Sequence, residues 1–222
     1  MTRLAIFDLD NTLLGGDSDH AWGEYLIHAG LVDADEHRRR NDGFYAQYKQ
    51  GVLDMNEYLE FAIAPVVGFS RDRLNALHEE FMQLFVEPMM LPAARQLVDR
   101  HKAEGDLCLI VTATNRFVTQ PIADRLGVHD LIATDLEEKA GVYTGKISGI
   151  PCFKAGKITK LGDWLKARGD RSLSLDHSIF YSDSFNDIPL LEAAAEAVAV
   201  DPDDTLRVHA QRKGWPIISL RQ

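Results

Sequence analysis

Cysteine is scarce in this sequence, and long apolar stretches are absent. The chain has 222 residues and two cysteines, Cys108 and Cys152, and neither stands in the spacing of a metal site or beside the partners of a catalytic thiol. We therefore interpret both as free thiols of a reducing compartment and expect a cytoplasmic protein. No apolar run approaches the roughly 18 residues that a transmembrane helix needs, and we expect no charged-then-apolar leader before the first apolar segment.

Positive charge is also in deficit. Lysine and arginine total 24 against 34 for aspartate and glutamate, so the formal net charge is −10. A chain of this charge is repelled by nucleic-acid phosphates, and it has no basic amphipathic face for a membrane surface. We therefore expect neither nucleic acid nor a membrane as a partner. The sequence contains no internal repeat or low-complexity segment, and it does not indicate the oligomeric state.

Hydrophobic residues make up 45% of the chain, which is enough for a sizeable core, but their pattern changes along the sequence. Residues 15–88 carry helical periodicities and no strand pattern. The predicted helices of this segment lie near 18–30, 33–49, 54–65 and 70–85. We therefore predict a small helical cap domain at 15–88, inserted into a core domain made of 1–14 and 89–222.

Outside that segment, short apolar strands alternate with amphipathic helices. Strands are predicted at 4–7, 107–111, 131–134, 178–181, 197–200 and 215–220, with a hairpin around 142–147. Helices are predicted over 93–103, 118–126, 158–165, 186–196 and 206–210. This alternation is typical of an α/β fold with a doubly wound, mainly parallel, Rossmann-like sheet.

Polar residues stand at the ends of three predicted strands. Asp8 and Asp10 follow the first strand, Thr112 follows the second, and Asp183 follows the strand at 178–181. Because parallel strands present their carboxyl ends along one edge of a sheet, we expect these residues to meet in one crevice. Carboxylates this close repel each other unless a cation or a shared proton intervenes, and Mg²⁺ is the natural hard cation for them.

The first of these strands belongs to a recognisable motif. LAIFDLDNTLL, residues 4–14, resembles the first motif of the haloacid dehalogenase (HAD) superfamily of phosphohydrolases. On its own, Asp-x-Asp also fits a strand that runs into an Asx turn. The resemblance implies that Asp8 is a nucleophile and that Asp10 is a general acid and base.

A second specific match is YSDSFNDIPLL at residues 181–191, which resembles the fourth motif of the superfamily. There, Mg²⁺ is bound by the first Asp side chain, the backbone carbonyl of the second Asp and an acid of the fourth motif. The resemblance therefore implies Asp8, Asp10 and Asp183 as metal ligands. We include Asp187 in this metal group, either orienting Asp183 or pairing with a lysine. Helix capping is the alternative reason for these acids.

Two further parts of the family pattern are less specific. LCLIVTATN is similar to the second motif, which implies that the Thr112 hydroxyl and the backbone N–H groups after it bind the phosphoryl group. Those N–H groups belong to Ala113, Thr114 and Asn115. A lysine that neutralises phosphoryl charge is expected in PCFKAGKITKL, where Lys154, Lys157 and Lys160 are all candidates. We choose Lys157, because it follows a glycine and opens the predicted helix.

The predicted cap is expected to select the leaving group of the substrate. Asp17, Ser18 and Asp19 leave the first strand near the expected nucleophile and are our candidates for facing the substrate. Carboxylates at this place suit a cationic leaving group, although helix capping explains them equally well. Arg38–Arg40, together with two nearby tyrosines, would instead receive a carboxylate, or form a solvated helix face.

The Asp-Ser-Asp stretch, Trp22 and the ending GWPIISL are similar to a histidinol-phosphatase-like branch of the phosphoserine phosphatase-like subfamily IB. This resemblance implies Mg²⁺-dependent hydrolysis of a small-molecule phosphate ester, histidinol phosphate first, through an aspartyl-phosphate. Phosphoserine or another metabolite phosphate, and transfer to an alcohol instead of water, stay open as alternatives. A carbon–halogen hydrolase does not need Asp10, and a receiver-type phospho-acceptor module is shorter and has no such cap.

Overall fold

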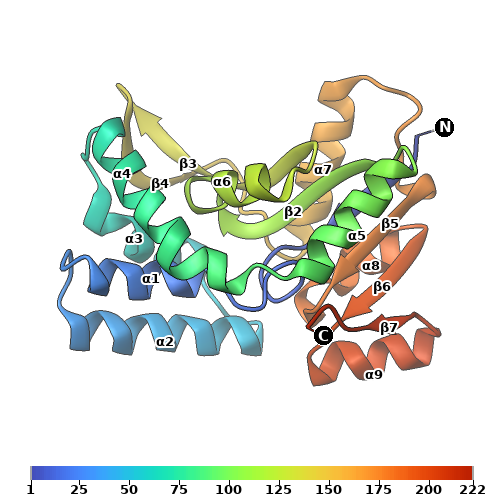
Figure 1. Cartoon of the computed structure of the whole chain (residues 1–222), viewed down its shortest axis with the longest axis horizontal. Helices are drawn as coiled ribbons and strands as arrows, with labels where there is room; N and C mark the ends of the chain where they lie inside the picture. The colour runs from blue at the N-terminus through green and yellow to red at the C-terminus, as the bar shows by residue number, and fades with distance from the viewer. Residues whose placement is uncertain (1, 222) are drawn as a thin grey trace.

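One sheet of seven strands organises the molecule, in a computed structural model that describes residues 2–221 (Figure 1). The strands are β1 Leu4–Phe7, β2 Leu107–Asn115, β3 Asp130–Lys139, β4 Val142–Ser148, β5 Ser178–Ser182, β6 Glu196–Val200 and β7 Ile217–Ile218. Their order is β4–β3–β2–β1–β5–β6–β7, and every pair is parallel except the hairpin of β3 and β4. The predicted doubly wound, mainly parallel α/β sheet is thereby confirmed.

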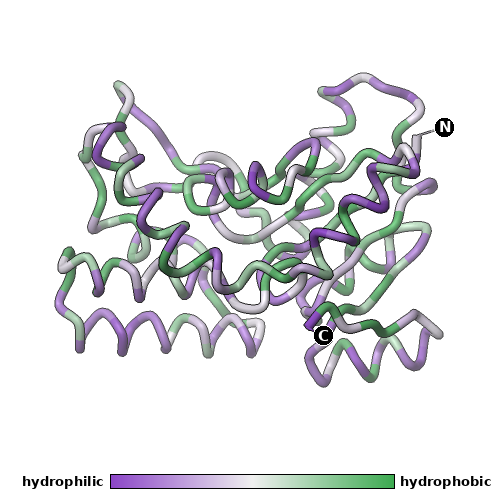
Figure 2. The backbone as a smooth tube through the Cα atoms, viewed as in Figure 1, coloured by the Kyte–Doolittle hydropathy of each residue, from purple (hydrophilic) through white to green (hydrophobic). Residues whose placement is uncertain are grey.

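The central strand β1 divides its side chains between two apolar layers. Leu4 and Ile6 belong to one cluster, and Ala5 and Phe7 to the other, as the alternation of a strand requires. The helices that cover the two faces are α5 Pro92–Ala103 and α6 Arg116–Leu126 on the side of Phe7, and α7 Ala155–Arg168, α8 Ile188–Ala193 and α9 Asp204–Lys213 on the side of Ile6. Because both faces are covered, the strands read as apolar runs, which appear in green in Figure 2.

Helices alone fill the segment between β1 and α5, at the left of Figure 1. They are α1 Ser18–His28, α2 Ala34–Gln50, α3 Met55–Ile63 and α4 Arg71–Phe81, followed by a π-helical turn at Met82–Val86 and a 3₁₀ turn at Glu87–Met89. Trp22 and Phe81 meet edge to face with ring centroids 5.2 Å apart, in the same apolar cluster as Phe7 of the sheet. A smaller cluster around Phe44 and Leu59 joins α2 to α3. The division into cap and core stays our proposal.

Two predicted elements near the sheet have other lengths in the structure. β3 continues to Lys139 instead of ending at 134, because it leaves the parallel sheet to pair with β4. The helix predicted over 186–196 starts as a 3₁₀ turn and ends at Ala193. The backbone of Ala194 is extended, and β6 begins two residues later.

The last strand is also shorter than predicted. Only Ile217 and Ile218 pair with β6, within the expected 215–220. The amide of Leu220 donates instead to the side chain of Asp201, at 3.0 Å, so the chain turns away from the sheet.

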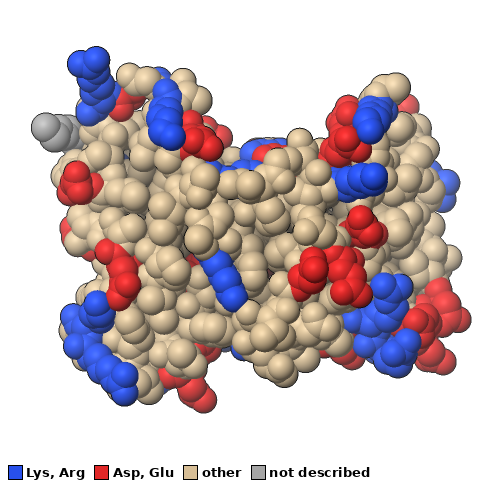
Figure 3. Space-filling view, turned by 180° about the vertical axis from the view of Figure 1, so that it is seen from behind, with Lys and Arg blue, Asp and Glu red and all other residues tan. Residues whose placement is uncertain are grey.

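No helix within residues 2–221 is both long and apolar enough to cross a membrane. On the face of the described chain that Figure 3 shows, acidic and basic side chains stand in small mixed groups, without a continuous basic band.

Candidate active site

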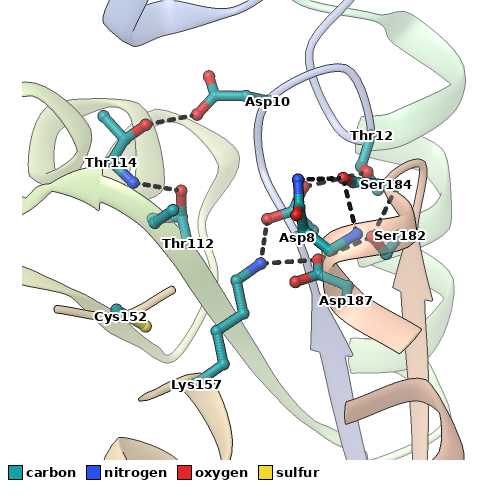
Figure 4. Close-up of polar contacts among 12 residues, drawn as sticks. Asp8, Asp10, Thr12, Thr112, Thr114, Cys152, Lys157, Ser182, Ser184 and Asp187 are labelled. Atoms are coloured by element: carbon teal, nitrogen blue, oxygen red, sulfur yellow. Dashed lines mark hydrogen bonds and ion pairs between the residues drawn. The ribbon is translucent and has the colours of Figure 1, made fainter. Parts of the chain in front are cut away.

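The carboxyl edge of the sheet brings the predicted acids together (Figure 4). Asp8 directly follows β1, and its amide donates to the carbonyl of Tyr181 in β5 at 2.9 Å. Asp183 directly follows β5. Because Phe7 and Tyr181 are in register in the parallel pair, the two acids leave neighbouring strands side by side. The side chain of Asp8 is buried, with 3% of its residue surface exposed.

Lys157 connects this cluster to the first turn of α7. Its Nζ lies 2.7 Å from Asp8 Oδ1 and 2.7 Å from Asp187 Oδ2, and the residue is 2% exposed. Burial disfavours the charged ammonium, but the carboxylates of Asp187 and Asp8 outweigh it and hold the pKa of Lys157 above its usual range. Of the other candidate lysines, Lys154 contacts the carbonyl of Gly51 and Lys160 pairs with an acid of β3.

Thr12 is a site residue to which we gave no role from the sequence. Its Oγ1 lies 3.0 Å from Asp183 Oδ1 and 3.4 Å from Asp8 Oδ2, and it accepts the amide N–H of Asp183 at 3.0 Å. The hydroxyl therefore bridges the two acids of the expected metal site. Its position in the first motif, four residues after Asp8, was a signal that could have identified it.

Asp187 is held by β5 as well as by the lysine. Ser182 Oγ donates to Asp187 Oδ2 at 2.8 Å and accepts the amide N–H of Ser184 at 3.2 Å. Burial raises the pKa of Asp187 to about 6, against the opposing influence of Lys157. Ser182, which directly precedes Asp183, thus bonds to both Asp187 and Ser184 in this chain.

Asp10 faces away from the lysine and toward the helical segment. Its carboxylate accepts the amide N–H of Ser18 at 2.6 Å and the hydroxyl of Thr114 at 2.8 Å. Burial raises its pKa to about 7, and the nearby charge of Asp17 adds to the shift. At neutral pH this carboxyl group can therefore carry a proton or lose one, as a general acid and base must.

The last four residues of β2 lie beyond the predicted strand end at 111, and several of their hydrogen-bonding groups already have partners within the protein. The amide N–H of Thr114 donates to Thr112 Oγ1 at 3.2 Å, and the carbonyl of Ala113 accepts the hydroxyl of Thr134 at 2.7 Å. Asn115 caps α6 through the amide of Val118. Of the predicted phosphoryl-binding residues, Thr112, Ala113 and Thr114 line the pocket, whereas Asn115 is fully buried and is not part of the pocket wall.

A pocket opens above Asp8 and Asp10, and its wall combines residues of the helical segment with residues 112–114 of β2. Asp17 and Asp19 belong to its wall. The wall residues that the sequence did not single out for this role are His20, Asn41, Phe44, Leu53, Met55 and Tyr58, and two more, Tyr45 and Tyr48, had been considered only as companions of the arginines. Asp183 lines an adjacent depression that shares Tyr45 and Tyr48 with this pocket.

Two of the features predicted to face the substrate, Ser18 and the run Arg38–Arg40, lie outside the pocket wall. The side chain of Ser18 is buried, and its backbone amide binds Asp10. The arginine run makes pairs of its own: Arg38 with Glu24, and Arg39 with Glu36. Arg40 lies over the ring of Phe61, 4.6 Å from its centroid.

The acid cluster carries more negative charge than its surroundings balance. The ammonium group of Lys157 contacts Asp8 and Asp187, whereas Asp183 contacts only the hydroxyl of Thr12 among these neighbours. Burial and the charge of Asp8 raise the pKa of Asp183 well above its usual range. The donors are carboxylate and hydroxyl oxygens, which are the ligands of hard divalent cations. The residues present therefore fit Mg²⁺.

A compact trio of ligating side chains occurs elsewhere in the described chain. His101, Glu104 and Asp106 each place one ligand atom within 4.8 Å of the others, and among residues 2–221 they form the single such group. The ring nitrogens of His101 already contact Asp106 at 2.7 Å and the hydroxyl of Tyr181 at 2.9 Å. Within residues 2–221, the acids near Asp8 do not form such a trio.

Comparison with known proteins assigns the family. The model of the haloacid dehalogenase-like hydrolases matches residues 5–192. The chain belongs to this family. It is 45% identical over 222 residues to a histidinol-phosphatase of Neisseria meningitidis serogroup C (strain 8013), and the match covers 100% of both chains. The family and this relative make the chain a phosphatase of the HAD superfamily.

Solved structures of this HAD phosphatase's relatives agree with its fold. A crystal structure of a protein with unknown function from Bordetella pertussis Tohama I has a TM-score of 0.91 and 46% identity, and covers 99% of this chain and 100% of that one. A substrate-bound phosphoserine phosphatase has a TM-score of 0.71 at 16% identity, with 100% and 95% covered. At that identity the second likeness concerns the fold alone.

Proposed function

We propose that this HAD phosphatase hydrolyses a small phosphate monoester through an aspartyl-phosphate on Asp8, with Mg²⁺ as cofactor and histidinol phosphate as substrate. The observation that carries the proposal is the buried contact of Lys157 with Asp8, at 2.7 Å. The ammonium group favours the ionised carboxylate and offsets charge on the phosphoryl oxygens. The metal, held by Asp8, the carbonyl of Asp10 and Asp183, would supply further positive charge there.

The proposed reaction has two steps. Asp8 Oδ attacks phosphorus while the bond from phosphorus to the leaving oxygen breaks, and Asp10 gives its proton to that oxygen. Water then attacks the phosphorus of the aspartyl-phosphate, Asp10 takes a proton from the water, and phosphate and free Asp8 result. The hydroxyl and amide contacts of Asp10 with Thr114 and Ser18 hold its carboxyl group beside this path. Thr112 is assigned to a phosphoryl oxygen.

The choice of substrate rests on the charges of the pocket wall. The wall contains Asp17 and Asp19, and among the described residues that form it there is no lysine or arginine. The carboxylate of phosphoserine would meet carboxylates there, which costs free energy. Histidinol phosphate carries an amine and an imidazole and no carboxylate. The four aromatic rings of Phe44, Tyr45, Tyr48 and Tyr58 also favour a cation.

Asp19 is the more specific of the two acids for this role. Asp17 Oδ1 accepts the amides of Asp19 and His20, so this side chain also caps α1. Asp19 is 8% exposed, and its Oδ1 accepts a hydrogen bond from Asn115 Nδ2 at 3.4 Å. Burial and the charge of Asp17 raise its pKa well above the usual range. A ligand cation would stabilise this buried carboxylate.

Steady-state kinetics on three esters would test the proposal. With Mg²⁺ present, we expect kcat/KM for histidinol phosphate to exceed that for phosphoserine about 100-fold or more, which corresponds to about 2.7 kcal/mol. p-Nitrophenyl phosphate serves as the generic ester that does not depend on the pocket. A preference for phosphoserine would contradict the substrate, and full activity in EDTA would contradict the metal.

The competing functions give other results in the same assay. A carbon–halogen hydrolase would release halide from a 2-haloacid in EDTA. A phospho-acceptor module would hold a long-lived phosphate on Asp8 without turnover. A phosphotransferase would place the phosphoryl group on an added alcohol faster than on water. Action in the cytoplasm stays a prediction from the sequence.

Asp19→Asn is expected to change substrate choice more than chemistry. The amide keeps the shape of the side chain but loses the charge that we assign to the substrate cation. We expect kcat/KM for histidinol phosphate to fall about 30-fold, and that for p-nitrophenyl phosphate to change less than about threefold. The matched control is Asp35→Asn at an exposed site in the first turn of α2, which should leave both values unchanged. Equal losses on both esters would argue against the role of Asp19.

Asp183→Asn is expected to abolish the effect of Mg²⁺ on stability. The substitution removes one charge from a cluster in which burial and Asp8 already raise the pKa of Asp183. In EDTA we expect the variant to melt about 2–4 °C above the wild type, for a gain of about 1 kcal/mol. Added Mg²⁺ should raise the melting temperature of the wild type and leave that of the variant nearly unchanged. Equal Mg²⁺ responses of the two proteins would exclude Asp183 as a ligand.

A further inference from the structure

Lys154, which the proposed mechanism does not use, reaches across to the helical segment. Its Nζ lies 2.5 Å from the carbonyl of Gly51, at the C-terminal end of α2. A cation at this end of a helix is favoured by the carbonyls that point toward it. The preceding residue adds an aromatic contact, since the rings of Phe153 and Tyr48 have centroids 5.9 Å apart.

A second loop of the sheet edge holds the same turn of α2. Asn186 is buried, and its Nδ2 donates to the carbonyl of Tyr48 at 3.2 Å. Phe185 packs against Gly51 so closely that a Cβ placed on this glycine would lie 2.8 Å from Phe185 Cζ. Gly51 also has φ of +71°, a conformation that favours glycine. Two loops that are distant in sequence therefore contact one turn, residues 48–51. We call this set of contacts, made by Lys154, Phe185 and Asn186, the grip.

The residues that make these contacts lie in the same two segments as the buried pair of Lys157 and Asp187. Lys154 stands three residues before Lys157, and Asn186 stands next to Asp187, so the grip comes from the two segments that carry the buried lysine–aspartate pair. Tyr48, the residue that is gripped, is part of the pocket wall. The position of the wall is thus tied to the loops that carry the chemistry.

We infer that Lys154 and Asn186 are positioning residues that hold the turn 48–51 over the acid cluster and thereby set Tyr48 in the substrate pocket. The inference rests on the proposed function for its effect on substrate, but the grip itself is a property of the ligand-free protein. The grip affects how the pocket binds the leaving group of the substrate, and it does not affect how the site binds the phosphoryl group. Loss of the grip should therefore raise KM and leave kcat nearly unchanged.

Lys154→Met tests the inference in the full-length enzyme. In the ligand-free protein, amide hydrogen exchange over residues 44–51 should rise about tenfold, which corresponds to 1.4 kcal/mol. KM for histidinol phosphate should also rise about tenfold, with kcat changed less than about threefold. Competitive inhibition by inorganic phosphate, which does not reach the pocket wall, should be unchanged. Lys154→Arg, which keeps the cation, should restore both exchange and KM at least in part.

Matched controls separate the grip from general destabilisation. Lys166→Met removes another paired lysine of α7, whose partner is Asp163 on the same helix, and should leave exchange and KM unchanged. Gly51→Ala is expected to reproduce Lys154→Met, because its Cβ would displace Phe185. Gly169→Ala also places alanine at a positive φ, +67°, but no atom lies within 4 Å of the new Cβ. This variant should therefore not reproduce the effects of Lys154→Met.

Unchanged exchange over residues 44–51 in Lys154→Met, or equal changes in Lys166→Met, would overturn the inference. If exchange is faster in Lys154→Met but the wild-type enzyme hydrolyses neither histidinol phosphate nor p-nitrophenyl phosphate, the inference about the turn 48–51 stands and the proposed function is refuted instead.

Discussion

Asp8→Asn is expected to lower kcat/KM for every phosphate ester by at least about 10⁴-fold, the scale of loss when a nucleophile is removed. The amide has no charged oxygen for attack on phosphorus, so neither leaving group nor substrate fit can compensate. The fold should persist, because Lys157 keeps its contact with Asp187 at 2.7 Å. Phosphate release measures the activity, and a circular-dichroism melt within a few degrees of the wild type shows that the protein is folded.

Asp10→Asn is the informative control for this result, because it changes the same site by one charge. If Asp10 protonates the leaving oxygen, the loss should be large for an alkyl ester and at least about tenfold smaller for p-nitrophenyl phosphate, whose leaving group needs no proton. The second step also lacks its base in this variant, so phosphate should accumulate on Asp8. Turnover of Asp8→Asn above about 1% of the wild type would refute the nucleophile.

Asp8 and Asp183 could be predicted because each of them directly follows a strand. An apolar run of four residues before Asp8, and the apolar residues 179–181 shortly before Asp183, indicate parallel strands, and a parallel sheet aligns their ends. The lysine was harder, because Lys154, Lys157 and Lys160 all lie near the start of one helix. Lys157 stands four residues before the buried Leu161, so both occupy the inward face of α7. The inward placement of that face is a tertiary property.

The pocket wall illustrates what sequence periodicity leaves open. Tyr48 stands at helical spacing from Phe44 in α2, and Tyr58 at helical spacing from Phe61 in α3. Such spacing is equally typical of a helix that faces a core. Which of these rings turn toward the acids depends on how α2 and α3 dock on the sheet edge, and for α2 the side chains of Lys154 and Asn186 contact its last turn. Chain segments about 100 residues apart or more meet there, and no local pattern records them.

The lengths of β3 and β7 have the same kind of cause. Each strand ends where its partner ends, and not where its own apolar run ends. Residues 135–139 have few apolar side chains and still extend β3, because β4 returns beside them. Leu220 is apolar and still lies outside β7, because the side chain of Asp201 takes its amide. Pairing therefore overrides propensity at both edges of the sheet.

Lys157→Met is expected to cost both activity and stability. The variant keeps most of the side-chain volume but leaves Asp8 and Asp187 buried without their shared cation, and breaking such a pair typically costs about 3–5 kcal/mol. For a chain of this size, that lowers the melting temperature by about 10 °C in EDTA. Turnover with Mg²⁺ should fall about 10³-fold, since the phosphoryl group also loses a fixed positive charge.

The pH dependence of the lost stability identifies its source. In the wild type, burial already raises the pKa of Asp187 to about 6, despite the lysine, whereas the unfolded chain has a value of about 3.9. A carboxyl group whose pKa is raised on folding binds protons more readily in the folded state, so its contribution to stability falls as pH rises between the two values. Without the lysine the folded pKa rises further. The cost of Lys157→Met should therefore be complete at about pH 8 and shrink toward about pH 4.5.

Urea unfolding at about pH 5 and pH 8, in EDTA, would measure this difference. Lys160→Met is the matched control on the same helix, because its partner Asp135 is 38% exposed and also paired with Arg116. Its cost should stay below about 1 kcal/mol at both pH values. If Lys157→Met costs as little as this control at pH 8, the buried carboxylates do not need the lysine, and the charge balance on which the proposed phosphoryl site depends is wrong.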